Sequence, residues 1–457
     1  MEKIRQRKRY VILPGTGIAS HAMESAVFKQ AHGASIAQEA KQQVERYFEL
    51  SSANTVVASA ITSVSSLADT LEEADFELIS QRFADGPATV RMSESAKMAL
   101  AAINPDFRIV PVTRYYIPGY KPRGKTMLAA LPAAVDANDA VNGVYMTDVK
   151  QHFLAGLAIE NHENGAGVTI GVVDSGIDNQ HPALTGRVAL MRCLVPGEDP
   201  NAGGPVDWGP NMSHLSGHGT HVAGIIAGEG GHGGPGGVAP AANLISYRIF
   251  PNNPTGMKGA ENGAIIDAIR AAVEDDCRVI NLSIEGSGLK DDGVRSAIAD
   301  AWSQGVLCIA AAGNGFGNPV SYPAAHPHCV AVTAVGREGS FPPMPELEQY
   351  VGNQRSQIDQ DVFLASFSNF GPRVQFTGPG HAIVSTFPHA GWWFNSGTSM
   401  AAPFVTGILA LLLASRPNVL GMIGNADRSA SMLQMLIAQA KMLRLPQAFH
   451  EGYGLPA

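Results

Sequence analysis

Near-continuous apolar segments alternate with helix-like segments in the C-terminal two thirds of the chain. Four of the apolar segments end in small or polar residues, and they span residues 167–176, 242–250, 278–284 and 305–313. Such segments are typical of strands that a parallel sheet buries on both faces. Segments with helical periodicity lie between them, at residues 221–228, 263–275 and 293–305. The alternation predicts βαβ units and an α/β fold, with a doubly wound, mostly parallel sheet flanked by helices.

The first 115 residues follow a different pattern, which predicts a smaller α+β domain. Residues 88–92 and 107–116 have the composition of strands, and residues 93–103 between them have the composition of a helix. Ser93 stands at the start of this helix, where its hydroxyl is suited to cap the N–H groups of the first turn. A strand–helix–strand unit is therefore predicted at the end of this domain.

These patterns divide the chain into three parts. We predict a small α+β domain over residues 1–115 and a large α/β domain over residues 146–457. Residues 116–145 are rich in Pro and Ala and weakly patterned, which indicates a linker. Acidic side chains exceed basic ones mainly after residue 145, which also separates the two domains.

The composition is that of a folded protein. Of the 457 residues, 45% are hydrophobic and only 16% are charged, and the formal net charge is -8. A chain without a basic excess gives no reason to expect nucleic acid as a partner. The four cysteines are too few for a disulfide scaffold of this size. Cys277 and Cys308 adjoin apolar runs, so we expect buried free thiols.

No export or membrane segment is predicted. The basic start MEKIRQRKRY imitates a signal peptide, but Pro14, Gly15 and Gly17 interrupt the short apolar stretch that follows. The longest apolar run, Ile408 to Ala414, is far too short to cross a bilayer. We therefore expect a cytoplasmic protein with no membrane partner.

Four polar residues stand where functional groups gather in a doubly wound sheet, beyond strand ends or at helix starts. Asp174 ends the first apolar run, Asn314 follows the last, His218 starts a helix of small residues, and Ser399 starts a long apolar helix. Singly, each has an ordinary structural role, such as a strand-end carboxylate, a turn residue, a core histidine or an N-cap. His218 and His221 also have a spacing that suits a metal, but the HExxH pattern is absent, which disfavours a zinc site.

Together the four residues supply the groups that amide hydrolysis by a serine requires. Ser399 offers a hydroxyl beside the N–H groups of a helix N-terminus, and His218 offers a base that removes the hydroxyl proton. Asp174 can orient the imidazole, and the side-chain amide of Asn314 can donate to the developing oxyanion. The combination predicts hydrolysis through a serine nucleophile.

The sequences around these residues resemble the motifs of subtilisin-like serine proteases. The matching segments are VVDSGID around Asp174, GHGTHVAG around His218, AAAGN ending at Asn314 and GTSMAAP around Ser399, in this chain order. The resemblance covers about residues 146–457. It implies a subtilisin-like fold and a serine endopeptidase that acts on proteins or peptides. It also implies that Asp174, His218 and Ser399 form a catalytic triad, and that Asn314 and the Ser399 N–H form the oxyanion hole.

The resemblance also implies which residues hold the substrate. Two backbone segments would bind the substrate chain and wall the S1 pocket, which receives the side chain of the P1 residue before the scissile bond. These are Ser283, Ile284 and Glu285 on one side, and Ala311, Ala312 and Gly313 on the other. In the family, a glycine usually occupies the place of Glu285. Two interpretations stay open: Glu285 adds negative charge at the pocket rim and favours basic or polar substrate residues, or it points into solvent.

No cofactor is expected. The family's strong calcium site draws on an Asp soon after the DSGID segment and on a later loop that contains Asn. This sequence has Ala183 at the first place and the loop EGGHGGPGG, residues 229–237, at the second. A hard cation needs several oxygen ligands, so the strong site is expected to be lost, while weaker calcium sites stay open.

The N-terminal domain resembles the propeptide of the family. The strand–helix–strand pattern of residues 88–116 is similar to the end of an inhibitory pro-domain. The resemblance implies a zymogen whose own N-terminal domain is an intramolecular inhibitor, with cleavage in the linker. The alternative is an accessory domain that is never removed.

Other functions stay open beside the endopeptidase. A subtilase-fold peptide-maturation protease or ligase would act on a dedicated peptide, and a non-catalytic binding module would use the fold alone. Residues 119–126 match the P-loop pattern, but Pro122 removes an N–H from the loop that would cradle phosphate, so nucleotide binding is not expected. Residues 340–363 are predicted to form a surface insertion.

Overall fold

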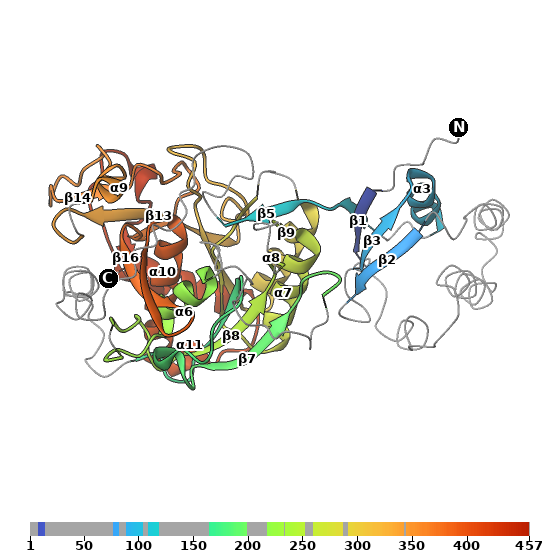
Figure 1. Ribbon diagram of the computed structural model, residues 1–457, viewed down its shortest axis with the longest axis horizontal. Helices are drawn as coiled ribbons and strands as arrows, with labels where there is room; N and C mark the ends of the chain where they lie inside the picture. The colour runs from blue at the N-terminus through green and yellow to red at the C-terminus, as the bar shows by residue number, and fades with distance from the viewer. Residues whose placement is uncertain are drawn as a thin grey trace. The chain divides into compact units, whose positions relative to one another are not determined.

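The chain forms two compact units. The computed structural model describes residues 8–13, 76–81, 88–103, 108–117, 164–198, 217–232, 234–251, 259–286, 291–341 and 344–456. The first unit comprises Met1–Thr113 with Glu261–Asp267 and Asp291–Gly293, and the second comprises Arg114–Ala260, Ala268–Lys290 and Val294–Ala457. Many of their helices and strands are labelled in Figure 1. The predicted linker lies mostly outside the described residues, so its boundaries stay a prediction.

The first unit contains an antiparallel sheet of four strands and one described helix. The strand order is β2-β3-β1-β4, with β1 Lys8–Leu13, β2 Phe76–Gln81, β3 Ala88–Met92 and β4 Arg108–Pro111. Helix α3, Glu94–Ile103, follows β3. The Ser93 hydroxyl accepts the Ala96 N–H at 3.1 Å, which confirms the predicted N-cap.

The strand predicted over residues 107–116 is two strands. Strand β4 pairs with β1, and this pairing ends where the N–H of Val112 donates to the carbonyl of Arg9. The next N–H, of Thr113, donates instead to the side chain of Asn262, so the ladder cannot continue. The following strand, β5 (Arg114–Tyr116), belongs to the second unit.

The second unit is built on a mostly parallel sheet of eight strands. The order is β14-β13-β12-β10-β6-β8-β7, and β15 also pairs with β13. Every pair is parallel except β13 with β14. The strands are β6 Thr169–Asp174, β7 Val188–Cys193, β8 Asn243–Arg248, β10 Val279–Leu282, β12 Leu307–Ala311, β13 Cys329–Arg337, β14 Val362–Leu364 and β15 Phe376–Pro379. The four apolar runs are β6, β8, β10 and β12, which confirms the predicted α/β fold.

Helices cover both faces of this sheet. The helices are α6 His218–Ala227, α7 Asn262–Glu274, α8 Asp292–Ser303, α9 Pro345–Glu348, α10 Thr398–Ala414, α11 Pro417–Leu420 and α12 Ala426–Gln439. Ile170 and Val172 of β6 belong to the buried cluster that contains α6 and α10. Gly171 between them faces the other side, where an added Cβ would lie 3.3 Å from Ala272 of α7.

Shorter elements complete the second unit. They are 3-10 turns η2 Pro182–Leu184 and η3 Ala448–His450, hairpin β16 Ile383–Phe387 with β17 Gly391–Asn395, the pair β18 Ala440–Lys441 with β19 Leu455–Pro456, and a sheet of β11 Glu285–Gly286, β5 and β9 Ala260–Glu261. The predicted insertion contributes α9 and the antiparallel edge strand β14, which buries Phe363. It therefore extends the central sheet.

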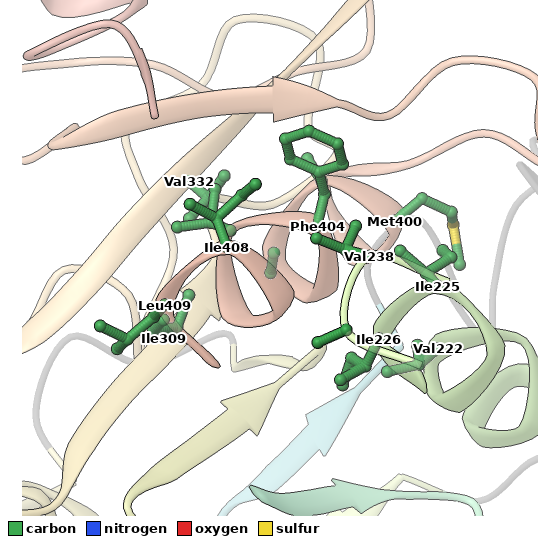
Figure 2. Packing of buried hydrophobic residues seen from close by; sticks show 14 of the residues in the cluster. Val222, Ile225, Ile226, Val238, Ile309, Val332, Met400, Phe404, Ile408 and Leu409 are labelled. Atoms are coloured by element: carbon green, nitrogen blue, oxygen red, sulfur yellow. The ribbon is translucent and has the colours of Figure 1, made fainter. Parts of the chain in front are cut away.

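Helix α10 is the centre of the hydrophobic core. Its side chains from Thr398 to Leu413 are all buried. Phe404, Ile408 and Leu409 point from α10 into a cluster that also contains Val332 of β13 and side chains of α6 (Figure 2). Because two packed helices meet here, the core fixes the N-terminal ends of both α6 and α10 above the sheet.

The four cysteines are free and buried, as predicted for Cys277 and Cys308. Burial raises the pKa of both of these thiols to about 12, because the thiolate would lose its hydration. Within the described part of the chain, no helix has the length and apolar character needed to span a membrane.

The core makes a direct prediction about stability. Ile408 in α10 is completely buried, whereas Ile423 is 84% exposed. Ile408→Ala should lower the free energy of unfolding by about 2–5 kcal/mol, because it removes buried methyl groups and leaves a cavity. Ile423→Ala, the matched control, should change it by less than about 0.5 kcal/mol. Urea unfolding in a Ser399→Ala background measures the free energy of unfolding of both variants. Equal losses of stability in Ile408→Ala and Ile423→Ala would contradict this description of the core.

Candidate active site

The predicted site residues lie at one edge of the central sheet. Strands β6, β10 and β12 are parallel neighbours, so their carboxyl ends meet at the same edge. Asp174 is the last residue of β6, Ser283 follows β10, and Asn314 follows β12 within three residues. The fold therefore gathers side chains that are up to 140 positions apart in the sequence (Asp174 to Asn314).

Asp174 and His218 form a buried hydrogen-bonded pair. The Nδ1 atom of His218 lies 2.8 Å from Oδ1 and 3.0 Å from Oδ2 of Asp174. Asp174 is fully buried, and the N–H of Ser175 also donates to its Oδ1 at 2.7 Å. A buried carboxylate needs such donors, because it has lost its hydration. The pair leaves Nε2 of His218 directed elsewhere, and this buried atom has no hydrogen-bond partner among the described residues.

Glycines allow the strand end and helix α6 to come this close. Gly217 precedes the helix with a φ of 104°, which disfavours other residues. An added Cβ at Gly219 would lie 2.2 Å from the carbonyl oxygen of Gly176 and 3.1 Å from Cβ of Asp174. The N–H of Gly219 donates to the hydroxyl of Ser175 at 3.0 Å. The small residues around His218 therefore set its distance from Asp174.

His221 has a structural role in the same helix. It is completely buried, and burial lowers its pKa to about 3, so the ring is neutral. Its Nε2 lies 3.0 Å from the carbonyl oxygens of Ile383 and Trp393. The neutral ring thus joins α6 to the hairpin β16–β17 and supports the helix that carries His218.

Ser399 is the second residue of α10 and lies beside Ser283. Its Oγ is 3.5 Å from the Ser283 carbonyl oxygen, and the Ser283 hydroxyl donates to the Ser399 carbonyl at 3.0 Å. Ser399 is buried, at the N-terminus of a helix that packs against α6, whose N-terminus carries His218. The residue therefore stands at the end of α10 that carries the unpaired first N–H groups and the positive dipole end.

The side chain of Asn314 is held in one orientation. Its Oδ1 accepts the Thr398 N–H at 3.0 Å and the Thr398 hydroxyl at 2.8 Å. The donor Nδ2 lies on the opposite side of the amide, close to the start of α10, where an added Cβ on Gly397 would be 2.9 Å away. Because Oδ1 is occupied, Nδ2 can donate next to Ser399.

The two predicted substrate segments face each other. Ser283 and Ile284 are completely buried, and Glu285 starts β11. Ala311 and Ala312 are also buried. Gly313 has a φ of 107°, and its N–H donates to the Thr398 hydroxyl at 3.1 Å. The carboxylate of Glu285 is turned toward this second segment, with Oε2 3.4 Å from the N–H nitrogen of Asn314, and the residue is partly exposed.

A strand of the chain itself pairs with the first segment. Strand β5 lies between β9 and β11, and its Tyr116 and Tyr115 pair antiparallel with Glu285 and Gly286. Tyr116 also closely approaches Gly259, where an added Cβ would lie 2.5 Å from the tyrosine ring. An extended segment therefore forms the middle strand between two backbone edges, as in binding by strand addition.

Sequence reasoning missed several residues that support the site. Thr398 orients Asn314, strand β9 pairs with the other edge of β5, and Ser321 and Asn369 bind the loop around Gly313. Asn369 accepts the Gly315 N–H at 2.7 Å and donates to Ser321 at 3.0 Å. Asn369 lies outside the four segments around Asp174, His218, Asn314 and Ser399, so no role was predicted for it.

The calcium prediction concerns residues away from this edge. Ala183 is completely buried in η2. Among the residues that the structure describes, no group of three or more His, Cys, Asp or Glu side chains is placed to hold a metal ion. The loss of the strong calcium site stays a prediction.

Comparison with known proteins agrees with this geometry. The model of the subtilase family matches residues 165–454, which contain all of the predicted site residues. The chain belongs to the subtilase family. It has the α/β subtilisin fold and is a serine endopeptidase, and this family acts on proteins or peptides.

Curated relatives cover the same region of this subtilase. Thermitase of Thermoactinomyces vulgaris is 32% identical over 58% of this chain and 82% of its own length. The major intracellular serine protease of Bacillus subtilis (strain 168) is 31% identical over 61% of this chain and 76% of its own. Subtilisin E of the same strain is 34% identical over 55% of this chain and 57% of its own.

The close packing at Gly219 predicts the effect of a single methyl group. Gly219→Ala should displace the Asp174 turn and lower kcat/KM by about 10²-fold, because small misplacements of reacting groups are costly. Gly421→Ala, whose added Cβ would meet only the Pro417 carbonyl, at 3.2 Å, should leave kcat/KM unchanged. Peptide hydrolysis per titrated active site gives kcat/KM for both variants. Wild-type activity of Gly219→Ala would show that the packing at Gly219 does not set the distance between Asp174 and His218.

Proposed function

We propose that Asp174, His218 and Ser399 are the catalytic triad of this endopeptidase. Ser399 Oγ attacks the substrate carbonyl carbon while Nε2 of His218 takes its proton, and the same proton then passes to the leaving amine. Water hydrolyses the acyl-enzyme in the second half of the reaction, again with His218 as base. The observation that carries the proposal is the buried Asp174–His218 pair, which leaves Nε2 available at the start of a helix packed against the helix of Ser399.

The oxyanion hole in this proposal is formed by the N–H of Ser399 and Nδ2 of Asn314. The proposal is supported by the bonds from Thr398 to Oδ1, which turn Nδ2 toward the N-terminus of α10. Donors that are already oriented need no reorganisation when charge develops on the substrate oxygen. Removal of such a side-chain donor in subtilisin, a member of this family, lowers turnover by about 10²–10³-fold.

The direction of the substrate chain follows from β5. Its antiparallel pairing sets Tyr115 opposite Gly286 and Tyr116 opposite Glu285, so a chain bound in this way runs toward Ser283 as it proceeds to its C-terminus. Ser283 is the residue whose carbonyl lies beside Ser399 Oγ. A substrate that binds as β5 does would therefore bring its carbonyl end to the nucleophile.

The same pairing supports a zymogen. We propose that the N-terminal region inhibits the protease because β5 occupies the substrate groove until it is displaced or cut. Ile117, which follows β5, is also buried, so the segment is held beyond the paired residues. Cleavage is proposed in residues 116–145, which lie almost entirely outside the described residues.

Covalent labelling tests the triad. A fluorophosphonate probe should label the wild-type protein at Ser399 after removal of the N-terminal region, and Ser399→Ala should lose both labelling and casein hydrolysis. Ser415→Ala, which removes a hydroxyl at the other end of α10, should keep both. Peptide mapping locates the label. Labelling of another residue, or hydrolysis by Ser399→Ala, would refute the proposed nucleophile.

Inhibition by a short peptide tests the zymogen. A peptide of residues 108–117 should inhibit the processed enzyme competitively, because it can pair with β11 as β5 does. A scrambled peptide of the same composition should be inactive. Ser399→Ala should also retain its N-terminus after incubation, as read by N-terminal sequencing. An accessory domain is indicated if the peptide has no effect and the wild-type chain stays intact.

A further inference from the structure

A buried asparagine interrupts the apolar strand β10. Asn281 is completely buried, and its neighbours in the strand, Ile280 and Leu282, are apolar. An amide is costly to bury unless its donor and acceptor atoms are hydrogen-bonded. Its Nδ2 donates to the hydroxyl of Ser283 at 2.9 Å, and its Oδ1 accepts from the hydroxyl of Thr406 at 3.1 Å. The amide therefore links the residue that follows β10 to helix α10.

The carbonyl of Ser399 needs a donor from outside its own helix. In an α-helix this carbonyl would accept from the N–H four residues later, but that residue is Pro403, which has no N–H. The hydroxyl of Ser283 donates to the Ser399 carbonyl at 3.0 Å. Because Ser283 and Ser399 are both buried, this hydroxyl supplies the hydrogen bond that the proline removes.

The hydrogen bonds all run in one direction. A hydroxyl donates only one proton, so Ser283 can donate to Ser399 only if it accepts from Asn281. The amide donates to Ser283 only with Nδ2 turned toward it, and the Thr406 hydroxyl favours that orientation by donating to Oδ1. The Thr406 hydroxyl also lies 3.0 Å from the Ala402 carbonyl, whose usual partner in the helix is the Thr406 N–H. The hydroxyl proton is therefore available to Asn281.

Ser283 contacts Ser399 at two points. Its hydroxyl holds the Ser399 carbonyl, and its own carbonyl lies 3.5 Å from Ser399 Oγ. If the amide of Asn281 were turned over, its Oδ1 would accept the Ser283 proton, and the Ser399 carbonyl would lose its donor. The first turn of α10 would then lose a restraint next to Ser399 Oγ, and small misplacements of a reacting group are costly.

Building on the proposed triad, we propose that Asn281 and Thr406 are positioning residues for Ser399. Thr406 holds the amide of Asn281, the amide directs the proton of the Ser283 hydroxyl, and this proton fixes the Ser399 carbonyl. Both side chains are completely buried, so they act without contact with the substrate. Their contribution therefore belongs to kcat and not to KM.

Thr406→Val tests the proposal, because it removes the hydroxyl and keeps the size of the side chain. The full chain is incubated to constant activity, and hydrolysis of a peptide is measured per titrated active site. Thr406→Val should lower kcat by about 10-fold with KM unchanged, because nothing then holds the amide of Asn281 in one orientation. Thr406→Ser should keep kcat within about 2-fold of wild type, because it retains the donor.

Thr377→Val is the matched control. Thr377 of β15 is also completely buried, and its hydroxyl donates to the Thr333 carbonyl at 3.3 Å, so the same substitution removes one buried hydrogen bond. It should lower stability to urea about as much as Thr406→Val does, and it should leave kcat unchanged. An equal loss of kcat in Thr377→Val would show that any weakening of the core impairs the site, and would overturn the proposal.

A double-mutant cycle with Ser283→Ala tests the route through the Ser283 hydroxyl. If Thr406 acts through this hydroxyl, adding Thr406→Val to Ser283→Ala should cause no further loss of kcat. Additive losses would contradict the proposed route. Wild-type kcat in Thr406→Val, or a change confined to KM, would refute the positioning role itself.

Fluorophosphonate labelling separates this proposal from the proposed triad. Absence of labelling at Ser399 in the wild-type enzyme would refute the triad, and with it the positioning of Ser399. A wild-type enzyme that is labelled at Ser399, with unchanged kcat in Thr406→Val, would refute the positioning roles of Asn281 and Thr406 alone.

Discussion

The hydrogen bonds between Asp174 and Nδ1 of His218 are the constraint on which the rest of the site depends. A carboxylate with no solvent exposure is costly to bury unless donors surround it, and the Ser175 N–H and the imidazole supply them. These bonds require that β6 ends and α6 begins at adjacent points in space. Gly219 meets this requirement because any larger residue would collide with the turn after β6.

The hydrophobic core transmits this constraint to Ser399. Helix α10 is buried along almost its whole length and packs on both α6 and the sheet (Figure 2). The packing of α10 on α6 therefore fixes the position of the helix N-terminus that carries Ser399 relative to the one that carries His218. Thr398, one residue earlier, fixes Asn314 in the same way. The buried helix α10 thus supports the residues at this sheet edge.

The sequence predicted the parts that depend on local pattern. The four buried strands, the N-cap at Ser93 and the four residues at strand ends and helix starts follow from apolar periodicity and its interruptions. The orientation of Glu285 could not be predicted, because it depends on contacts with Ser321 and Gly313, about 30 positions away, which no periodicity encodes. For the same reason, the sequence pattern of residues 107–116 could not show that the second half of this segment pairs with Glu285 and Gly286. That pairing joins segments about 170 positions apart.

A crystal structure of the covalent adduct with diisopropyl fluorophosphate tests the central claim most directly. The account predicts phosphorus bonded to Ser399 Oγ, with a phosphoryl oxygen that accepts hydrogen bonds from the Ser399 N–H and from Nδ2 of Asn314. It also predicts that Nδ1 of His218 keeps its bonds to Asp174 while Nε2 faces the adduct. An adduct whose phosphoryl oxygen points away from Asn314, or a His218 ring separated from Asp174, would contradict it.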